Sequence, residues 1–161
     1  MKKKIFLLFA VFSLTYSASS QISPNAIGLR GGPGIYGLGG EITYQKALGG
    51  SNRLELDFGA RSSKNHNHLL VTGIYHWWWN ITDGLNWYVG PGAQLGLYNH
   101  RYDNDNDGIT IGIGGQIGIE YNFNQHGVPI LLSLDSRPMW DFFGYYNGFG
   151  YGGAFAIRYT F

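Results

Sequence analysis

The 161-residue sequence has no cysteine, few charges and, after its first 20 residues, no long apolar run. Without cysteine there is no disulfide framework, no thiolate metal site and no acylated lipoprotein cysteine. Charged residues make up only 13% of the chain, which is thin for a fully wetted surface. No apolar run beyond residue 21 reaches the roughly 20 residues that a membrane-spanning helix requires, so spanning helices are not expected there.

Glycine and aromatic residues are abundant instead, with 26 glycines and an aromatic content of 17%. The glycines follow no three-residue period, which excludes collagen, and so many aromatic residues argue against disorder. Glycine suits tight turns and crowded sheet walls, whereas aromatic rings suit the interfacial girdles of membrane barrels. The composition therefore favours a single all-β domain.

The first 20 residues have the pattern of a secretory signal peptide. Lysines at positions 2–4 precede an apolar run at 5–14, and small residues at 18–20 permit cleavage between Ser20 and Gln21. The run is too short for a transmembrane anchor. We therefore predict a mature domain of residues 21–161. That domain has eight basic and ten acidic residues, without the basic patch of a nucleic-acid-binding protein.

The last stretch of the chain, residues 149–161, alternates between two kinds of side chain. Apart from Gly153, aromatic and aliphatic residues occupy the odd positions, whereas glycine, alanine, Arg158 and Thr160 occupy the even ones. Since successive side chains of a strand point to opposite faces, this segment has one apolar and one small or polar face. Such a strand suits a membrane barrel, with lipid on the apolar side and a polar lumen on the other.

Further segments alternate in a similar way, at 25–32, 38–48, 53–61, 68–79, 85–97, 109–121 and 128–137. With the terminal segment they make eight, the even number of single-chain bacterial barrels, each near the 9–11 residues of a tilted membrane strand. The register of 68–79 is ambiguous. We place Leu69, Val71, Tyr75 and Trp77 outward, which turns His68, Thr72 and His76 inward.

The connections alternate between compact turns and longer loops. Turns rich in Asn, Asp and Gly lie at 49–52, 80–84 and 122–127, and longer loops are predicted at 62–67, 98–108 and 140–148. This asymmetry between the two ends is typical of outer-membrane barrels. We predict an all-β fold, an eight-stranded antiparallel up-and-down transmembrane β-barrel with both termini on the periplasmic side. The terminal strand is expected to close the barrel against the first strand, near Ile27 and Leu29.

The C-terminal pattern resembles an outer-membrane assembly signal, with Phe155, Ile157, Tyr159 and Phe161 at alternate positions. With the alternation over the mature chain, the sequence resembles the small outer-membrane β-barrel family represented by OmpA and OmpX. The resemblance implies a monomer in a Gram-negative outer membrane, in contact with its lipids and lipopolysaccharide, and with the assembly machinery through the last strand. It implies no single function, because such barrels include adhesins, channels, anchors and enzymes.

Nine charged residues have the parity opposite to the apolar faces. A charge on the lipid face near mid-bilayer costs about 2–4 kcal/mol, so this parity indicates the lumen. An eight-stranded lumen is only wide enough for side chains, and buried charges must pair. We predict a polar lumen plugged by Arg30, Glu41, Glu55, Asp57, Arg61, Glu120, Asp135, Arg137 and Arg158. A narrow ion or proton path along these residues is the alternative.

One loop is a weak candidate for a metal site. Asp103, Asp105 and Asp107, followed by Gly108, match the beginning of a calcium-binding loop. The glutamate that this pattern requires at its twelfth position is replaced by Gly114. The same residues are good turn formers, so we expect neither a metal nor a cofactor.

The five histidines do not form a recognisable catalytic motif. Deacylating lipid A enzymes of this fold class carry a His-x-Ser pair, and no histidine here has a serine two positions later. His66 and His68 would chelate a metal from an extended chain, but the sequence supplies no third ligand. We expect no catalytic residues, with a lipid A-modifying enzyme as a minor alternative.

Aromatic residues gather in two places. Trp77, Trp78 and Trp79 with Trp87 fit an interfacial girdle, whereas the aromatic residues at 140–146 would cover the barrel mouth or meet a partner. We predict a structural or surface-interaction role through the loops at 98–108 and 140–148. The alternatives are a narrow pore for ions or small solutes and a soluble calycin-like barrel, which would bind its ligand on an apolar inner face.

Overall fold

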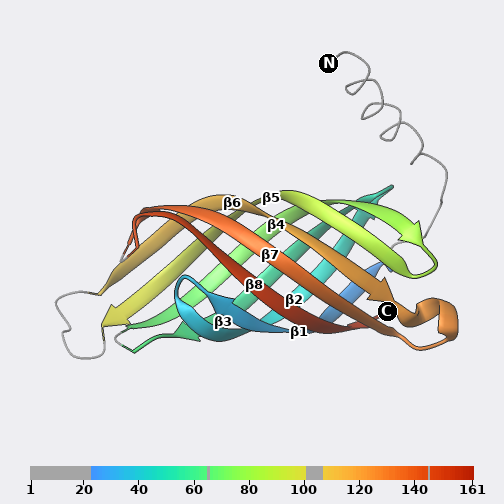
Figure 1. The fold of residues 1–161 in the computed structure, drawn as a ribbon, viewed down its shortest axis with the longest axis horizontal. Coiled ribbons are helices and arrows are strands. Elements are labelled where there is room, and N and C mark those ends of the chain that lie inside the picture. Colours follow the sequence, from blue (N-terminus) through green and yellow to red (C-terminus); the bar gives the residue numbers. More distant parts are fainter. Residues whose placement is uncertain (1–22, 65, 101–106, 145) are drawn as a thin grey trace, which may run out of the picture.

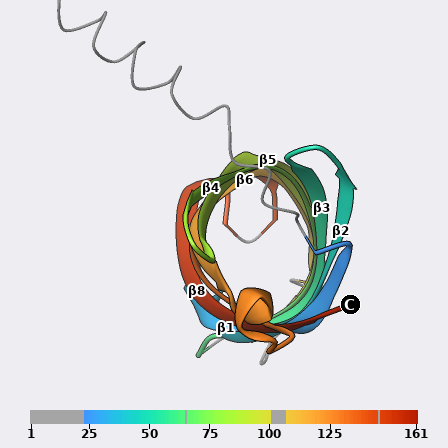
Figure 2. The same ribbon diagram turned by 90° about the vertical axis from the view of Figure 1, so that its right-hand side faces the viewer.

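The computed structural model describes residues 23–64, 66–100, 107–144 and 146–161. Within these ranges eight strands form one closed barrel, in which each strand pairs antiparallel with its neighbours in sequence (Figures 1 and 2). The strands are β1 (Asn25–Gly34), β2 (Gly37–Gly49), β3 (Asn52–Ser62), β4 (His66–Thr82), β5 (Leu85–His100), β6 (Gly108–Asn122), β7 (Ile130–Phe143) and β8 (Gly148–Thr160). The predicted all-β, up-and-down barrel architecture is confirmed.

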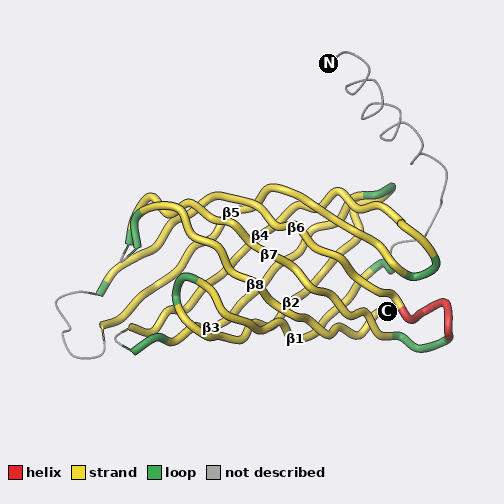
Figure 3. Tube along the Cα trace, in the orientation of Figure 1, coloured by secondary structure: helices red, strands yellow, loops and turns green. Residues whose placement is uncertain are grey.

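A single short helix interrupts the sheet in the described part of the chain. This 3-10 helix, η2 (Phe123–His126), lies between β6 and β7 (Figure 3). Among the described residues no helix is long and apolar enough to cross a membrane. The predicted signal peptide, residues 1–20, lies outside the described residues.

The barrel closes where β8 pairs with β1. Leu29 lies opposite Ile157, as predicted for the terminal strand. Asn25 and Phe161 each donate a backbone N–H to the other's carbonyl oxygen, at 3.0 Å. A Cβ atom at Gly28 would lie 1.9 Å from the carbonyl oxygen of Ile157, so glycine is required for this close approach of the two strands.

The two ends of the barrel differ in their connections. The terminal end holds both chain ends of the barrel, η2 and the β2–β3 and β4–β5 turns, whereas the mouth end holds the remaining connections (Figure 1). Gly50 and Gly84 adopt positive φ angles of 58° and 71° in the two tight turns at the terminal end. A residue with a Cβ would be strained there.

Several strands are longer than predicted, and the three longer predicted loops are correspondingly shorter. β4 has 17 residues and β5 has 16, where 9–11 were expected for crossing the bilayer alone. The loops predicted at 62–67 and 140–148 shrink to 63–65 and 144–147, because the strands continue toward the mouth. The barrel therefore extends beyond the length that a membrane crossing needs.

β7 shows why the sequence pattern was misread at one strand end. It covers Ile130–Phe143, not the predicted 128–137. The residue after the predicted end, Pro138, has no backbone N–H to donate to a neighbouring strand. The pairing of β7 with β6 omits Pro138 and Arg137 and resumes between Met139 and Gly114. The strand thus continues past the proline, and residues 140–143 belong to the wall and not to a loop.

The apolar faces of the strands point away from the barrel axis. Leu29 is 64% exposed, Leu134 is 58% exposed and Phe155 is 53% exposed. A soluble calycin-like barrel would place these faces inside, so that alternative is wrong. The register preferred for β4 is correct, since Leu69 and Val71 are exposed.

The barrel interior also has an apolar part, which lies mainly along β4. Leu70, Ile74 and Trp78 of β4 are buried inside. Trp78 was predicted to lie in a lipid-facing girdle, but its indole N–H donates a hydrogen bond of 2.6 Å to Glu120. Alternation within the triplet places Trp77 outside, where it is 45% exposed. Three consecutive tryptophans on one strand cannot share a face.

Candidate functional site: the barrel interior and its mouth

Among the described residues, charged side chains from six of the eight strands fill the interior. The nine charges assigned to the lumen are all buried, and Arg53 and Asp141 are buried with them. The interior thus holds five arginines and six carboxylates. The two lysines of the described residues, Lys46 and Lys64, are exposed. Arginine suits such a site because its planar guanidinium binds several carboxylates in fixed directions.

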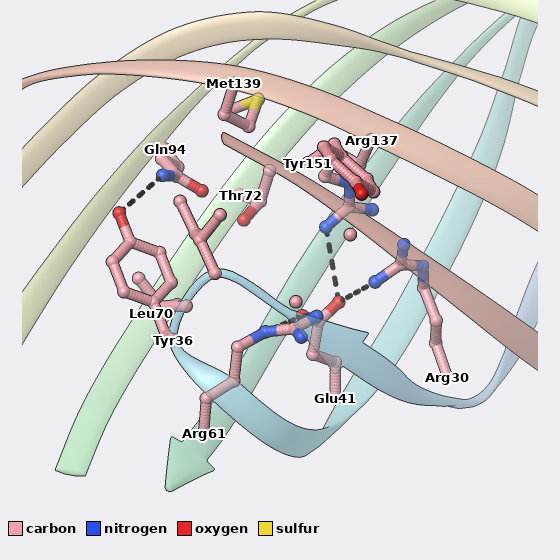
Figure 4. A pocket seen from close by; sticks show the side chains of 13 residues that line it. Arg30, Tyr36, Glu41, Arg61, Leu70, Thr72, Gln94, Arg137, Met139 and Tyr151 are labelled. Atoms are coloured by element: carbon pink, nitrogen blue, oxygen red, sulfur yellow. Dashed lines mark hydrogen bonds and ion pairs between the residues drawn. The ribbon is translucent and has the colours of Figure 1, made fainter. Parts of the chain in front are cut away.

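Glu41 of β2 accepts contacts from three arginines on three other strands (Figure 4). Its Oε2 lies 2.7 Å from Nη1 of Arg30 and 3.2 Å from Nη1 of Arg137. Its Oε1 lies 2.6 Å from Nη2 of Arg61. Arg30 is bound on its other side by Asp135 of β7. We call Glu41 and its three arginines the Glu41 cluster.

A second set of contacts extends the network toward the terminal end. Arg137 also binds Asp57 and lies 3.2 Å from Glu55. Glu55 in turn binds Nη2 of Arg158 at 3.0 Å, and its Oε2 accepts a hydrogen bond from Gln45. These contacts join β2, β3, β7 and β8 across the lumen. Burial of unpaired charges would be costly, so the pairing is required for folding.

A third group lies closer to the terminal end and includes a residue that we did not predict. Arg53 binds Glu120 with an Nη2–Oε2 distance of 2.6 Å. Its guanidinium lies 4.6 Å from the ring centre of Tyr88 and donates to Nδ1 of His76. Arg53 has the parity of Glu55, the neighbour two residues on, so the same alternation would have found it.

At the mouth end Asp141 is held by hydrogen bonds. The hydroxyl of Tyr36 donates to one carboxylate oxygen, and Nε2 of Gln94 donates to the other at 2.7 Å. Tyr36 lies in the β1–β2 turn, where burial and then the hydrogen bond to Asp141 raise the pKa of its hydroxyl. The hydroxyl therefore remains a donor. Asp141 was missed because it was assigned to the last loop.

A small pocket separates the Glu41 cluster from this mouth group. Its volume is about 30 Å³, and Arg61, Glu41, Tyr36 and Met139 are among its lining residues (Figure 4). A water molecule needs roughly 10–15 Å³ of such volume. The pocket therefore has room for about two waters and is too small for an organic solute.

Three of the five histidines meet at the mouth. His66 of β4 lies directly opposite His100 of β5, and their ring centroids are 4.5 Å apart. His68 lies 6.3 Å from His66 and packs at 4.4 Å against the ring of Tyr36. His126 lies at the terminal end, where its Nε2 is 3.0 Å from the hydroxyl of Tyr121.

The structure describes only one of the three aspartates of the weak metal-site candidate, Asp107. Asp103 and Asp105 lie outside the described residues. Asp107 closes the base of the β5–β6 connection, where its carboxylate accepts from the backbone N–H of His100 at 2.9 Å and from Asn99 at 3.2 Å. Among the described residues, no group of three or more His, Cys, Asp or Glu side chains is placed to hold a metal.

The C-terminal pattern lies on the outer wall. Phe155, Ile157, Tyr159 and Phe161 are between 47% and 57% exposed and all point away from the lumen. The rings of Tyr159 and Phe161 lie nearly parallel, with centroids 6.2 Å apart. The residues therefore form a continuous apolar strip along β8, next to the closure of the barrel.

Comparison with solved structures identifies the same architecture elsewhere. Neisserial surface protein A superposes with a TM-score of 0.68 and 12% identity, covering 88% of this chain and all of that one. The N-terminal β-barrel domain of Pseudomonas aeruginosa OprF superposes with a TM-score of 0.59 and 19% identity, again over 88% of this chain and all of that one. Ail, the attachment invasion locus protein of Yersinia pestis, superposes with a TM-score of 0.53 and 11% identity, covering 85% of this chain and 96% of that one.

At these identities the likeness concerns the fold. The chain has the fold of the small eight-stranded outer-membrane β-barrels. No model of a known protein family matches the sequence, and no curated protein matches it either.

Proposed function

We propose that the protein resides in the outer membrane of a Gram-negative bacterium, that its lumen is closed to solutes, and that it acts at the cell surface through the mouth end. The observation that carries this proposal is the pairing of an apolar outer wall with a charged, filled interior. The predicted signal peptide supports export from the cytoplasm.

The outer wall supports a lipid environment. Burying an exposed leucine, isoleucine or phenylalanine is worth about 1.5–3 kcal/mol, and every strand presents several of them. In water these side chains would form an apolar surface far larger than soluble monomers show. Outer-membrane lipids and lipopolysaccharide are therefore the proposed surroundings.

The interior supports a closed lumen. The Glu41 cluster links β1, β2, β3 and β7 across the barrel, and the neighbouring pocket holds only about two waters. A solute would have to separate arginine from carboxylate in a site sheltered from water. Breaking a buried pair costs about 3–5 kcal/mol when one partner is lost.

The mouth end supports a surface role. Phe142, Phe143 and Tyr146 are 43%, 65% and 40% exposed at and after the end of β7. These residues are available to outer-leaflet lipid or to a partner at the cell surface. The loops predicted for this role at 98–108 and 140–148 are shorter in sequence, since the residues at their ends belong to the flanking strands.

Epitope insertion tests the location and the orientation together. A short tag between Ser63 and Lys64, at the mouth end, is expected to be labelled on intact cells. The same tag between Gly50 and Ser51, in the β2–β3 turn at the terminal end, serves as the matched control and is expected to be labelled only after the outer membrane is permeabilised. Fractionation with soluble periplasmic proteins, or labelling of the control tag on intact cells, would contradict the proposal.

The remaining parts of the proposal concern partners and chemistry. The strip of Phe155, Ile157, Tyr159 and Phe161 is proposed to bind the outer-membrane assembly machinery, and the mature protein is proposed to be a monomer without a cofactor. No catalytic role is proposed. Mass spectrometry of lipid A from cells with and without the protein tests this point, because a changed acyl pattern would reveal a lipid-modifying enzyme.

A narrow pore is the second candidate. It is favoured by the water-sized pocket beside Arg61, the most exposed arginine of the Glu41 cluster at 8%. A path would form if the Arg61–Glu41 contact opened. We rank it below the closed lumen because Glu41 retains two further arginines and because Asp141, Tyr36 and Gln94 fill the lumen nearer the mouth.

A further inference from the structure

The histidines at the mouth are not explained by the closed lumen or by the outer wall. His66 and His100 occupy directly opposed positions on neighbouring antiparallel strands. His66 is buried at 3% exposure and His100 is partly exposed. The backbone of His100 is fixed by the hydrogen bond from its N–H to Asp107. Two imidazoles are thus held side by side where the interior meets the outside.

The spacing of these two rings matches that of two imidazoles on one metal ion. A Zn–N bond of about 2.0–2.1 Å places each ring centroid about 3.2 Å from the metal. Two such rings at angles between 90° and the tetrahedral value then have centroids roughly 4.5–5.2 Å apart, and the shorter value corresponds to 90°. The observed separation of His66 and His100 is 4.5 Å. The angle of 82° between their planes is compatible, because each ring turns freely about its bond to the metal.

His68 does not belong to this pair. Its ring is 6.3 Å from that of His66 and is packed between Tyr36 and Tyr98, at 4.4 Å and 5.8 Å. The described residues therefore supply two ligands, and other donors complete the coordination. This agrees with the finding that no group of three His, Cys, Asp or Glu side chains in the described part of the chain is placed to hold a metal.

We propose that His66 and His100 bind a divalent metal ion of the Cu²⁺ or Zn²⁺ type at the mouth of the barrel. Imidazole nitrogen is a preferred ligand of these ions, and Cu²⁺ binds most tightly of the first-row series. Opposed residues on paired strands are already at the required spacing, so little freedom is lost on binding. The ion clamps β4 to β5 beyond the membrane-spanning part of the wall.

Titration calorimetry with Zn²⁺ on the full mature protein in detergent micelles tests the proposal. The variants H66Q and H100Q are each expected to lose at least tenfold in affinity. H126Q is the matched control, because it removes one histidine at the opposite end, and it is expected to bind like the wild type. Binding should also weaken when the buffer is acidified below about pH 6, since a metal-bound imidazole must be neutral.

Electron paramagnetic resonance with Cu²⁺ tests the proposal on the wild-type protein, so the result does not depend on whether a variant folds. The spectrum of the wild-type protein is expected to show hyperfine coupling to two imidazole nitrogens. Heat-modifiable gel mobility establishes whether each variant is folded before its affinity is compared. Wild-type Cu²⁺ spectra without coupling to two nitrogens, or Zn²⁺ affinities of folded H66Q and H100Q equal to that of H126Q, would overturn the proposal.

Discussion

The Glu41→Gln variant removes the carboxylate on which three arginines converge. An amide keeps one oxygen acceptor, but its NH₂ group would then face a guanidinium, donor against donor. Glu41 and its partners are at most 8% exposed, so bulk water does not replace the lost contacts. Removing one partner of a buried ion pair typically costs about 3–5 kcal/mol. We therefore expect the free energy of unfolding to fall by about that amount.

Urea titration of the protein in lipid vesicles measures this change. Folded and unfolded fractions are separated by heat-modifiable gel mobility, and the urea midpoint is compared with that of the wild type. Asp83→Asn is the matched control, since it makes the same carboxylate-to-amide change at an exposed residue of the β4–β5 turn. Surface substitutions of this kind usually remain within about 0.5 kcal/mol.

A double variant shows whether the loss comes from unpaired guanidinium groups. Arg61 is the most exposed of the three arginines. Glu41→Gln combined with Arg61→Gln therefore removes one guanidinium group that has lost its carboxylate partner, at a small cost in the free energy of unfolding. It is expected to recover part of the stability lost in Glu41→Gln. If Glu41→Gln shifts the midpoint no more than Asp83→Asn does, the interior network is not the stabilising element that we describe.

Three further variants test other parts of the barrel. Gly28→Ala is expected to lower the free energy of unfolding by about 3 kcal/mol, because its Cβ would lie 1.9 Å from a carbonyl oxygen of β8 and the backbone there cannot move aside. Gly40→Ala is the control, because its Cβ would meet nothing within 4 Å. Equal urea midpoints for the two variants would contradict the prediction. Phe161→Ala keeps the backbone bonds of the last residue and is expected to lower the folded yield in cells while refolding in vitro is unchanged; normal yield in cells would remove it from the assembly signal. Tyr36→Phe removes a donor to buried Asp141 and is expected to cost about 1–3 kcal/mol in the same urea titration, whereas an unchanged midpoint would show that the hydroxyl is dispensable.

Much of the barrel wall was predictable because its physical constraint repeats every two residues. Parity alone decides whether Glu55, Asp57 and Arg61 face the lipid or the lumen. Of these two environments, only the lumen tolerates a charged side chain. Closure of β8 against β1 near Leu29 followed from the even strand number and the apolar terminal strand. These features are local or depend only on strand order.

Strand ends were harder to predict because the membrane sets only a minimum length. β4 and β5 continue toward the mouth and remain paired with each other up to His66 and His100. The prediction ended β7 at Arg137, yet the strand continues through Pro138, where local pairs with β6 are omitted. Asp141, three residues later, was lost from the predicted interior as a result.

The sequence did not predict which of the interior charges pair with each other. Parity places Arg30 inside, but its partner Asp135 is 105 residues away in sequence. That pairing depends on the stagger of strands around the whole barrel. The three-histidine grouping at the mouth likewise depends on the β4–β5 register, which alternation alone left ambiguous.

Single-channel recording in planar bilayers tests the central claim most directly, since the claim is that a lipid-facing barrel encloses a filled lumen. The purified wild-type protein, verified as folded by its heat-modifiable mobility, is inserted at neutral pH under an applied voltage. We predict a bilayer whose conductance does not change when the protein inserts. Reproducible single-channel steps would contradict the closed lumen and favour the narrow pore.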